Sequence, residues 1–247
     1  HSSGRLAAPL CFAGAVCMQI LGKFGIEVGA HIYSVGDNTD PPFDMVNISA
    51  KDLADIKEKE FPTVSDDAGR LMRTEIEKAR LNLDSLGGII ECAVINLPAG
   101  LGDPMFSGVE NKLASAVFGI PAVRGIEFGA GFAAAKMTGS EHNDPYRIKN
   151  GRIVTETNNH GGIIGGITTG MPLVFRAAIK PTASIAQEQN TVSLSELTET
   201  KLTIKGRHDP CIVPRAVPVV ESVAAIVMAD LLTIETGYRN MCKKVQE

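Results

Sequence analysis

The residues best suited to chemistry lie in one short segment, at positions 206–218. Arg207, His208 and Asp209 are consecutive there, and Arg215 follows within the same segment. An arginine binds phosphate or carboxylate through two parallel hydrogen bonds, and an aspartate beside it stays ionised and can accept a proton. Three prolines restrict the backbone, because each fixes its own φ and lacks an N–H donor. The segment suits an anionic ligand and proton transfer, although an exposed loop with an Arg–Asp ion pair explains the same residues.

A second polar segment, Lys180–Ser184, follows an extended apolar run. Its lysine provides a point charge, its threonine and serine provide hydroxyl donors, and its turn offers backbone amides. These groups suit a phosphate or the edge of a flavin, and an ordinary loop is the alternative. Arg5 stands near the start of an expected helix, where the positive end of the helix dipole disfavours a cation. This mismatch favours a role for Arg5, with Arg207 and Arg215, in binding a polyanionic ligand.

Hydrophobic periodicity and capping residues indicate the elements that must position these side chains. We expect a helix from Leu6 to Leu21 with Ser2 or Ser3 as its N-cap. Because this helix is apolar on nearly all faces, it should be central in the fold. Apolar runs predict strands over 26–32, 89–97 and 123–128.

Other segments predict further helices and one irregular region. Ser49 followed by Asp52 matches a capping box, and Ser65 is placed to start a longer helix. Helices are also expected over 109–118 and 217–232. Residues 137–160 are rich in Asn, Asp and Gly and can bury little apolar surface, so we predict a mobile excursion there. The sequence Gly-Gly-Ile-Ile at 87–90 recurs at 161–164, a weak sign of a duplicated unit.

Composition restricts the class of protein. The chain has 247 residues, 44% of them hydrophobic, and a net charge of −4, so it can bury a substantial core and lacks the basic tail of a nucleic-acid-binding protein. Five cysteines without a C-x-x-C pair indicate a reduced, cytoplasmic protein rather than a disulfide framework or a zinc finger. His160 and His208 have no companion ligand at suitable spacing, so no metal site is expected. The apolar stretch 6–21 is short for a membrane span, so no membrane association is expected.

Gly129–Ala134 gives a competing hypothesis. It reads G-x-G-x-x-A after an expected strand and fits the dinucleotide-binding fingerprint, which would make the protein a nicotinamide-dependent dehydrogenase. No acidic residue for the ribose follows on a clear second strand, and the preceding sequence does not alternate strands with helices. A glycine-containing turn at the end of a strand is the other explanation.

Five segments of the chain, taken in order, resemble the chorismate synthase family. They are Ser2-Ser3-Gly4-Arg5; Leu97-Pro98-Ala99-Gly100-Leu101-Gly102-Asp103-Pro104-Met105-Phe106; Asn158 with Gly161-Gly162-Ile163-Ile164-Gly165-Gly166; Lys180-Pro181-Thr182-Ala183-Ser184; and GRHDPCIVPRAVPVVE from Gly206 onward. Together they cover nearly the whole chain, which makes the signal specific. The resemblance implies an α+β fold, a pseudo-symmetric sandwich of helices and antiparallel sheets.

The resemblance also implies an activity. The family converts 5-enolpyruvylshikimate 3-phosphate to chorismate and phosphate by a 1,4-anti elimination in the shikimate pathway, and it requires reduced FMN. The chain is therefore expected to be a carbon–oxygen lyase of aromatic amino-acid biosynthesis, a cytoplasmic homotetrameric flavoprotein with a small-molecule substrate. NADPH is a candidate reductant for the flavin.

Residues that match the family's motifs carry expected roles. Asp209, Arg207 and Arg5 are expected to be catalytic, with Asp209 handling the proton of flavin N5, while Arg5 and Arg215 bind substrate. A glycine at 165 would let the backbone approach a large planar ligand. The expected flavin contacts are His1, Ser2, Ser3, Pro121, Ala122, Gly165, Lys180, Pro181, Thr182, Ala183, Ser184 and Arg207.

The resemblance departs from the family at the N-terminal side. Family members begin with a segment carrying a Gly-Glu-Ser-His-Gly motif, which this chain does not contain, and many have Arg where His1 stands. We therefore expect residues 1–247 to form a single domain that lacks the N-terminal part, and the isolated chain to produce no measurable chorismate. The alternative function is a non-catalytic flavin- or anion-binding fragment of the enzyme.

Overall fold

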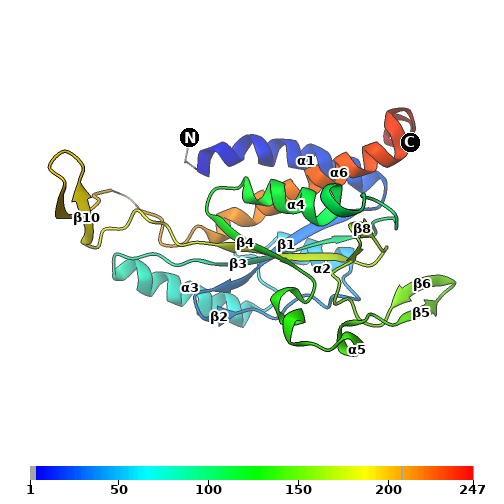
Figure 1. Cartoon of the computed structure of the whole chain (residues 1–247), viewed down its shortest axis with the longest axis horizontal. Coiled ribbons are helices and arrows are strands. Elements are labelled where there is room, and N and C mark those ends of the chain that lie inside the picture. The colour runs from blue at the N-terminus through cyan, green and yellow to red at the C-terminus, as the bar shows by residue number, and fades with distance from the viewer. Residues whose placement is uncertain (1–3, 207, 247) are drawn as a thin grey trace.

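An antiparallel sheet of five strands lies at the centre of the protein, with the strand order β2-β1-β3-β9-β4 (Figure 1). The computed structural model describes residues 4–206 and 208–246. The strands are β1 (Glu27–Val35), β2 (Asn38–Thr39), β3 (Gly88–Ile95), β4 (Val123–Phe128) and β9 (Leu173–Ile179). The strands predicted over 26–32, 89–97 and 123–128 are confirmed as β1, β3 and β4.

Helices cover both faces of this sheet. On one face lie α1 (Ala7–Lys23), α4 (Val109–Phe118) and α6 (Val213–Gln246, interrupted at Gly237), and on the other lie α2 (Ala50–Lys57) and α3 (Asp66–Leu81). β3 and β9 are buried on both sides, because their apolar residues contact both helical layers. The α+β class and the sandwich of helices and antiparallel sheet are confirmed.

Local signals explain where several helices begin. Ser49 and Asp52 form the predicted capping box of α2: the Ser49 amide donates to Asp52 Oδ2 at 2.9 Å, and the Asp52 amide donates to Ser49 Oγ at 3.2 Å. Ser65 caps α3, accepting from the Ala68 amide. The helix predicted over 109–118 is confirmed as α4. These positions depend on contacts between near neighbours, which sequence patterns describe well.

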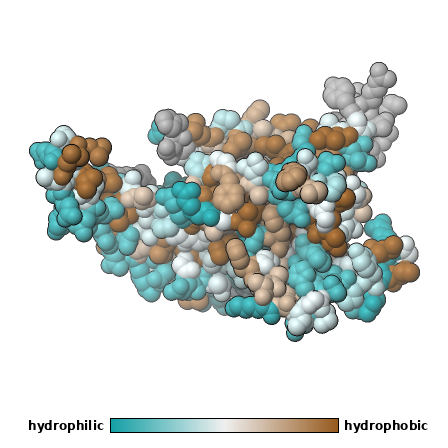
Figure 2. Space-filling model, in the orientation of Figure 1, coloured by the Kyte–Doolittle hydropathy of each residue, from teal (hydrophilic) through white to brown (hydrophobic). Residues whose placement is uncertain are grey.

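α1 forms where it was predicted, but the prediction that it is central is wrong. Only Ala7, Gly14 and Leu21 are buried in it, and Phe12 is 76% exposed. Gly14 allows α1 to approach α6 closely, since a side chain there would overlap Ser222. A helix that is apolar all round does not indicate which stripe will be covered, and here only one stripe meets α6. Figure 2 shows apolar residues along the outer surface of this helix.

Among the described residues, two helical stretches are long and apolar enough to cross a membrane, judged by length and composition. They are Gly4–Lys23 and Val213–Gly237, and the apolar windows within them are 17% and 72% buried in the protein. The burial of the second stretch is that of a core helix. The expected N-caps of the first, Ser2 and Ser3, lie outside the described residues, and the N-cap position is occupied by Leu6 without a side-chain hydrogen bond.

The remaining elements are short helices and two-stranded hairpins outside the central sheet. They are η1 (Gly4–Leu6), η2 (Met105–Ser107), η3 (Gly131–Lys136), α5 (Gly139–His142) and the hairpins β5–β6 (Tyr146–Lys149, Arg152–Thr155), β7–β8 (Ile163–Ile164, Ile167–Thr168) and β10–β11 (Gln189–Ser193, Thr198–Leu202). The last hairpin projects from one end and β5–β6 from the other (Figure 1). Residues 137–160 thus contain α5 and β5–β6, and their mobility stays a prediction.

Two sequence hypotheses fail against this topology. Gly129–Ala134 does follow β4, but the sheet is antiparallel and the next element is the 3₁₀ helix η3, so the strand–turn–α-helix that holds a dinucleotide pyrophosphate is missing there. The dehydrogenase hypothesis is therefore wrong. The repeated Gly-Gly-Ile-Ile is no structural repeat: residues 87–90 enter the central strand β3, whereas 161–164 enter the two-residue strand β7.

The edge of β1 that faces away from β3 is covered along part of its length. β2 pairs only with Ser34 and Val35. Farther along, the Ala30 amide donates to Glu221 Oε1 of α6 at 2.9 Å, and the Ile32 amide donates to the Pro62 carbonyl at 2.8 Å. Burial raises the pKa of the Glu221 carboxyl above its ordinary value.

Candidate functional site

One end of the sheet collects most of the polar residues selected from the sequence; we call it the loop end and define it by Pro121–Ala122, Lys180–Ser184 and Asp209–Arg215. β9 ends at Ile179, which pairs with both Gly88 of β3 and Val123 of β4. The Lys180 amide donates to the Ala122 carbonyl at 2.9 Å. The antiparallel register therefore brings these three segments together although they are far apart in sequence.

The two long helices on one face of the sheet, α1 and α6, both begin at the loop end. Val213, the first residue of α6, lies against Gly88 at the start of β3, and this contact places the start of α6 at the loop end. α1 runs antiparallel to β1, since a turn of three residues, 24–26, joins the end of one to the start of the other, and α1 therefore begins toward the end of the sheet where β1 ends (Figure 1). Arg5, an exposed residue in η1, is therefore on this side as well. Two helix N-termini add partial positive charge to the cations Lys180 and Arg215.

Asp209 is half-buried and held by two contacts. Arg215 Nη1 lies 3.0 Å from Asp209 Oδ2, and the Cys211 amide donates to Asp209 Oδ1 at 3.2 Å. Arg215 itself is largely exposed, so its guanidinium can also meet a ligand. His208 Nε2 donates to the Ile204 carbonyl at 3.0 Å. Burial raises the pKa of the Cys211 thiol to about 11, which keeps it protonated and a poor nucleophile.

The two neighbouring loops, before β4 and after β9, carry a strained residue and a buried hydroxyl without a described partner. Ala122 has φ +76°, a conformation that residues with a side chain rarely adopt and that often marks functional sites. Thr182 Oγ1 is buried, and no described residue forms a hydrogen bond with it. A buried hydroxyl without a partner costs free energy unless another molecule supplies the missing bond. The two loops are thus suited to a ligand that offers hydrogen-bond acceptors and negative charge.

Other residues expected at the site lie elsewhere. Gly165 is in the turn of β7–β8, where φ is +62° and a side chain would meet nothing within 4 Å, so the local need for glycine is the turn itself. This hairpin packs against the 97–106 segment: the Gly100 amide donates to the Thr168 carbonyl at 2.8 Å. That contact is at the opposite end of β9, roughly 20 Å from Lys180. His1, Ser2, Ser3 and Arg207 lie outside the described residues.

Two surface cavities lie away from the loop end. One, of about 500 Å³, is bordered by Phe43, Asp52 and Lys59. The other, of about 560 Å³, lies between α4 and α6 and is bordered by Asn111 and Asp230. Neither cavity borders the loop end, and the candidate site is placed by its polar groups.

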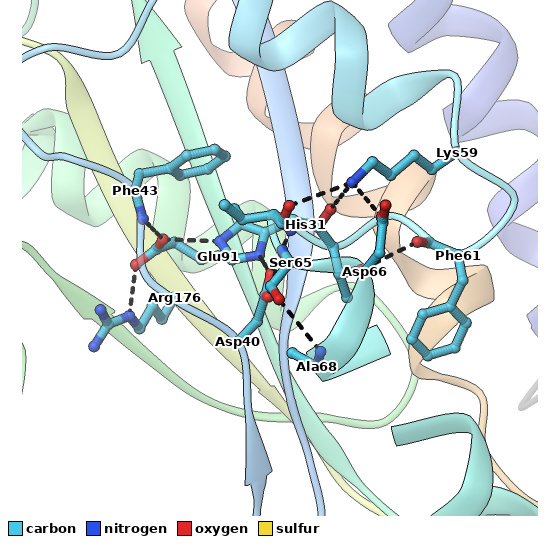
Figure 3. A network of polar contacts seen from close by, with 12 residues as sticks. His31, Asp40, Phe43, Lys59, Phe61, Ser65, Asp66, Ala68, Glu91 and Arg176 are labelled. Carbon is cyan, nitrogen blue, oxygen red and sulfur yellow. Dashed lines mark hydrogen bonds and ion pairs between the residues drawn. The ribbon is translucent and has the colours of Figure 1, made fainter. Parts of the chain in front are cut away.

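A second polar centre, which sequence reasoning missed, surrounds His31 in the middle of β1 (Figure 3). The His31 side chain is fully buried between two carboxylates: Nδ1 lies 2.8 Å from Asp40 Oδ2, and Nε2 lies 2.9 Å from Glu91 Oε2. Arg176 Nε donates to Glu91 Oε1 at 2.8 Å, and its guanidinium stacks on Tyr33. We call His31, Asp40, Glu91 and Arg176 the His31 network. A neutral imidazole has only one N–H, so two ionised carboxylates at these distances require the imidazolium.

Backbone donors complete the His31 network. The Phe43 amide donates to Glu91, and the Val64 and Ser65 amides donate to Asp40. Burial opposes charge on His31, but hydrogen bonds and the negative charges of Asp40 and Glu91 raise its pKa above the ordinary value. Burial likewise opposes charge on Glu91, but hydrogen bonds from His31 and Phe43 and the nearby cations lower its pKa. The network joins the 40–65 segment to the sheet.

Comparisons with known proteins identify the family. A family model described as chorismate synthase matches residues 1–233. The chain belongs to the chorismate synthase family. It is 49% identical to the chorismate synthase of Korarchaeum cryptofilum over 92% of this chain and 62% of the relative, and 49% identical to that of Thermococcus gammatolerans over 98% and 66%.

A solved crystal structure of chorismate synthase shares the fold. It superposes with a TM-score of 0.79 at 28% sequence identity, covering 99% of this chain and 68% of that one. This chain thus spans 62–66% of the length of the two curated chorismate synthases named above. Within that span, the described residues of the family segments gather toward two places: the loop end, and the opposite end where β7–β8 meets residues 97–106.

Proposed function

We propose that the protein is a chorismate synthase that eliminates phosphate from 5-enolpyruvylshikimate 3-phosphate in the 1,4-anti sense and so produces chorismate in the shikimate pathway. Family membership over residues 1–233 supports a lyase of aromatic biosynthesis. The loop end is the observation that carries the specific proposal. There Lys180, Arg5 and Arg215 share one end of the sheet with Asp209 and with the N-termini of α1 and α6.

This charge distribution matches the substrate. 5-Enolpyruvylshikimate 3-phosphate carries two carboxylates and one phosphate, so it requires several cations at short range. Arg215 is exposed enough to form a two-point hydrogen bond with such a group while its other side holds Asp209. The N-termini of α1 and α6 add oriented amide dipoles, which favour anions without needing a counter-ion.

The loop residues also fit reduced FMN. Lys180 supplies a cation, Ser184 supplies a hydroxyl, and Thr182 has a buried hydroxyl for which no described residue is a partner. We propose that Lys180–Ser184 and Ala122 hold the flavin, with Arg207, His1, Ser2 and Ser3 completing its contacts and NADPH as the source of reduction. The bound flavin would supply electron density as phosphate departs.

The chain's own residues then have distinct tasks. Arg5 and Arg215 bind and orient the anionic substrate, which lowers the entropy lost on reaching the reactive geometry. Asp209 accepts and returns a proton at its Oδ atoms, and its contacts with Arg215 and the Cys211 amide fix the position of those atoms. We propose that the protein is a homotetramer and that it is cytoplasmic; the free cysteines at positions 11, 17, 92 and 211 agree with a reducing compartment.

The decisive experiment is turnover by the full protein. Purified protein, reduced FMN and 5-enolpyruvylshikimate 3-phosphate are expected to yield chorismate and inorganic phosphate in equal amounts under anaerobic conditions. Flavin binding without any product would instead indicate a flavin- or anion-binding protein and would contradict the proposal.

A further inference from the structure

A short linker between α3 and β3 contacts two of the segments that define the loop end, Lys180–Ser184 and Asp209–Arg215. Ser85 Oγ donates to the Thr182 carbonyl at 2.6 Å, and the Leu86 amide donates to the Pro210 carbonyl at 2.8 Å. The first bond reaches the Lys180–Ser184 loop, and the second reaches the residue beside Asp209. One linker of a few residues therefore contacts two segments that lie about 100 residues or more farther along the sequence.

Local chemistry holds this linker in place. The Asp84 amide donates to the Ala79 carbonyl at 2.9 Å, which ties the linker to the last turn of α3. Asp84 Oδ1 accepts from the Ser85 amide at 2.8 Å. Leu83 has φ +58°, so the chain turns sharply where the helix ends. Ser85 is thus presented from a fixed turn and not from a free loop.

Gly87 and Gly88 allow the linker backbone to pack closely against neighbouring segments. A side chain on Gly87 would come within 2.5 Å of the Ile179 carbonyl and 3.0 Å of Pro181, and one on Gly88 would overlap the Ser34 carbonyl. Only residues without a side chain let the backbone approach so closely. Gly87 therefore sets how closely the linker approaches the Lys180–Ser184 loop, and Gly88 sets how closely it approaches β1.

The bond from Ser85 has a directional consequence. In a trans peptide the C=O of one residue and the N–H of the next lie in one plane and point in opposite directions. Ser85 fixes the Thr182 carbonyl, so it also directs the Ala183 N–H away from the linker. The same peptide belongs to the residue whose buried hydroxyl has no described partner. Ser85 thus orders the donors that the loop presents to a ligand.

We propose that Ser85 is a positioning residue for the flavin-binding loop and that, with the Leu86 amide, it sets the spacing between Lys180–Ser184 and Asp209. The inference rests on the proposed function, because it assigns Ser85 to that site. Ser85 acts through the Thr182 peptide, so its loss should loosen ligand binding without removing a ligand contact.

Flavin titration of three variants of the full protein tests this role. Ser85→Ala is expected to weaken FMN binding by about three- to tenfold, the worth of one neutral hydrogen bond. Ser85→Thr keeps the hydroxyl and is expected to restore affinity. Ser222→Ala is the matched control, because Ser222 Oγ donates to the Pro218 carbonyl at 2.7 Å in α6, remote from the loop. Unchanged affinity in Ser85→Ala, or equal weakening in Ser222→Ala, would overturn the proposal.

Hydrogen exchange without flavin separates this proposal from the proposed function. Amides of residues 182–184 should exchange faster in Ser85→Ala than in the wild type, and at the wild-type rate in Ser222→Ala. If the wild type fails to bind FMN, the proposed function fails, while exchange still tests the role of Ser85. Exchange that is the same in all three proteins would contradict a positioning role whatever the ligand.

Discussion

The His31 network and the loop end are both rich in charge, but they differ in how their polar atoms are satisfied. Around His31, both ring nitrogens meet a carboxylate, and backbone amides and Arg176 complete the bonding of those carboxylates. At the loop end, Thr182 Oγ1 has no described partner and Arg215 is largely exposed. The first centre is satisfied by residues of the chain itself, whereas the second presents an exposed cation and a hydroxyl for which no described residue is a partner.

This difference separates stabilising charge from binding charge. A buried network with every donor and acceptor used fixes one conformation and cannot bind a ligand without losing bonds. A cluster with exposed cations, a strained Ala122 and an unpaired hydroxyl is less stable alone and gains bonds when a ligand arrives. Substitutions in the two centres should therefore change different measured quantities.

The largest effect is expected from Asp209→Asn at the loop end. The amide keeps the shape of the carboxylate but cannot accept and return a proton, so turnover should fall by about 10²–10⁴. Steady-state kinetics at saturating substrate and reduced FMN measure this loss, and thermal melting of the same variant should be nearly unchanged. A lower melting temperature with a near-normal saturated rate would mean that Asp209 only braces Arg215.

Glu91→Gln should produce the opposite result in the His31 network. Removing one charge from a buried pair leaves its partners uncompensated, so the free energy of unfolding should fall by about 3–5 kcal/mol. Denaturant unfolding measures this loss, and flavin affinity of the folded protein should stay within about twofold of the wild type. Glu75→Gln, which removes an exposed pair with Lys78, is the control and should cost at most about 1 kcal/mol. Equal losses in both variants would erase the distinction.

Lys180→Ala should weaken ligand binding more than it weakens the fold. The loss of one charge-assisted hydrogen bond corresponds to about a ten- to hundredfold increase in the FMN dissociation constant. Fluorescence titration of the full protein measures it, with Lys51→Ala on α2 as the control for loss of a surface cation. Wild-type affinity in Lys180→Ala would remove this residue from the flavin site.

The pH dependence of stability should give the smallest effect. The pKa of His31 is raised in the folded state, so its stabilisation is complete below about pH 6.5 and disappears as pH rises through the folded-state pKa. The pKa of Glu91 is lowered, so its stabilisation is complete above about pH 4.3 and disappears on acidification. Unfolding of wild type and His31→Gln should therefore differ most between these two values.

Two measurements sharpen this pH prediction. Nitrogen-15 spectra at pH 7 should show protons on both ring nitrogens of His31. His142→Gln, a substitution outside the network, should leave the pH profile of unfolding unchanged. A His31 ring with a single proton at pH 7 would mean that the network is held together without the imidazolium.

Local patterns predicted the elements better than their surroundings. The capping box of Ser49 and Asp52 and the limits of α4 depend on residues within one helical turn, and the structure confirms them. The burial of α1 depends on which stripe meets α6, and this in turn depends on a close approach at Gly14 that no pattern in α1 reveals. Short-range chemistry could therefore be predicted, whereas the choice of buried face could not.

The candidate site was predicted in part for the same reason. Lys180–Ser184 and Asp209 were recognised from residue types and from family resemblance, but their proximity arises from the register of β3 with β9. Gly165 was grouped with them, although β9 places it at the other end of the sheet. His31 was passed over because its partners, Asp40 and Glu91, stand 9 and 60 residues away, and no spacing rule connects such positions.

Glu221 has a consequence for the behaviour of the protein in concentrated solution. Glu221 accepts the Ala30 amide, and the Pro62 carbonyl accepts the Ile32 amide. Two donors that a strand from another molecule would need are therefore occupied. Exposed strand edges are common starting points of intermolecular β-sheet growth and fibrils. The carbonyl oxygen of a carboxyl group accepts a hydrogen bond whether or not the group is ionised, so Glu221 keeps the Ala30 amide of β1 occupied on both sides of its raised pKa.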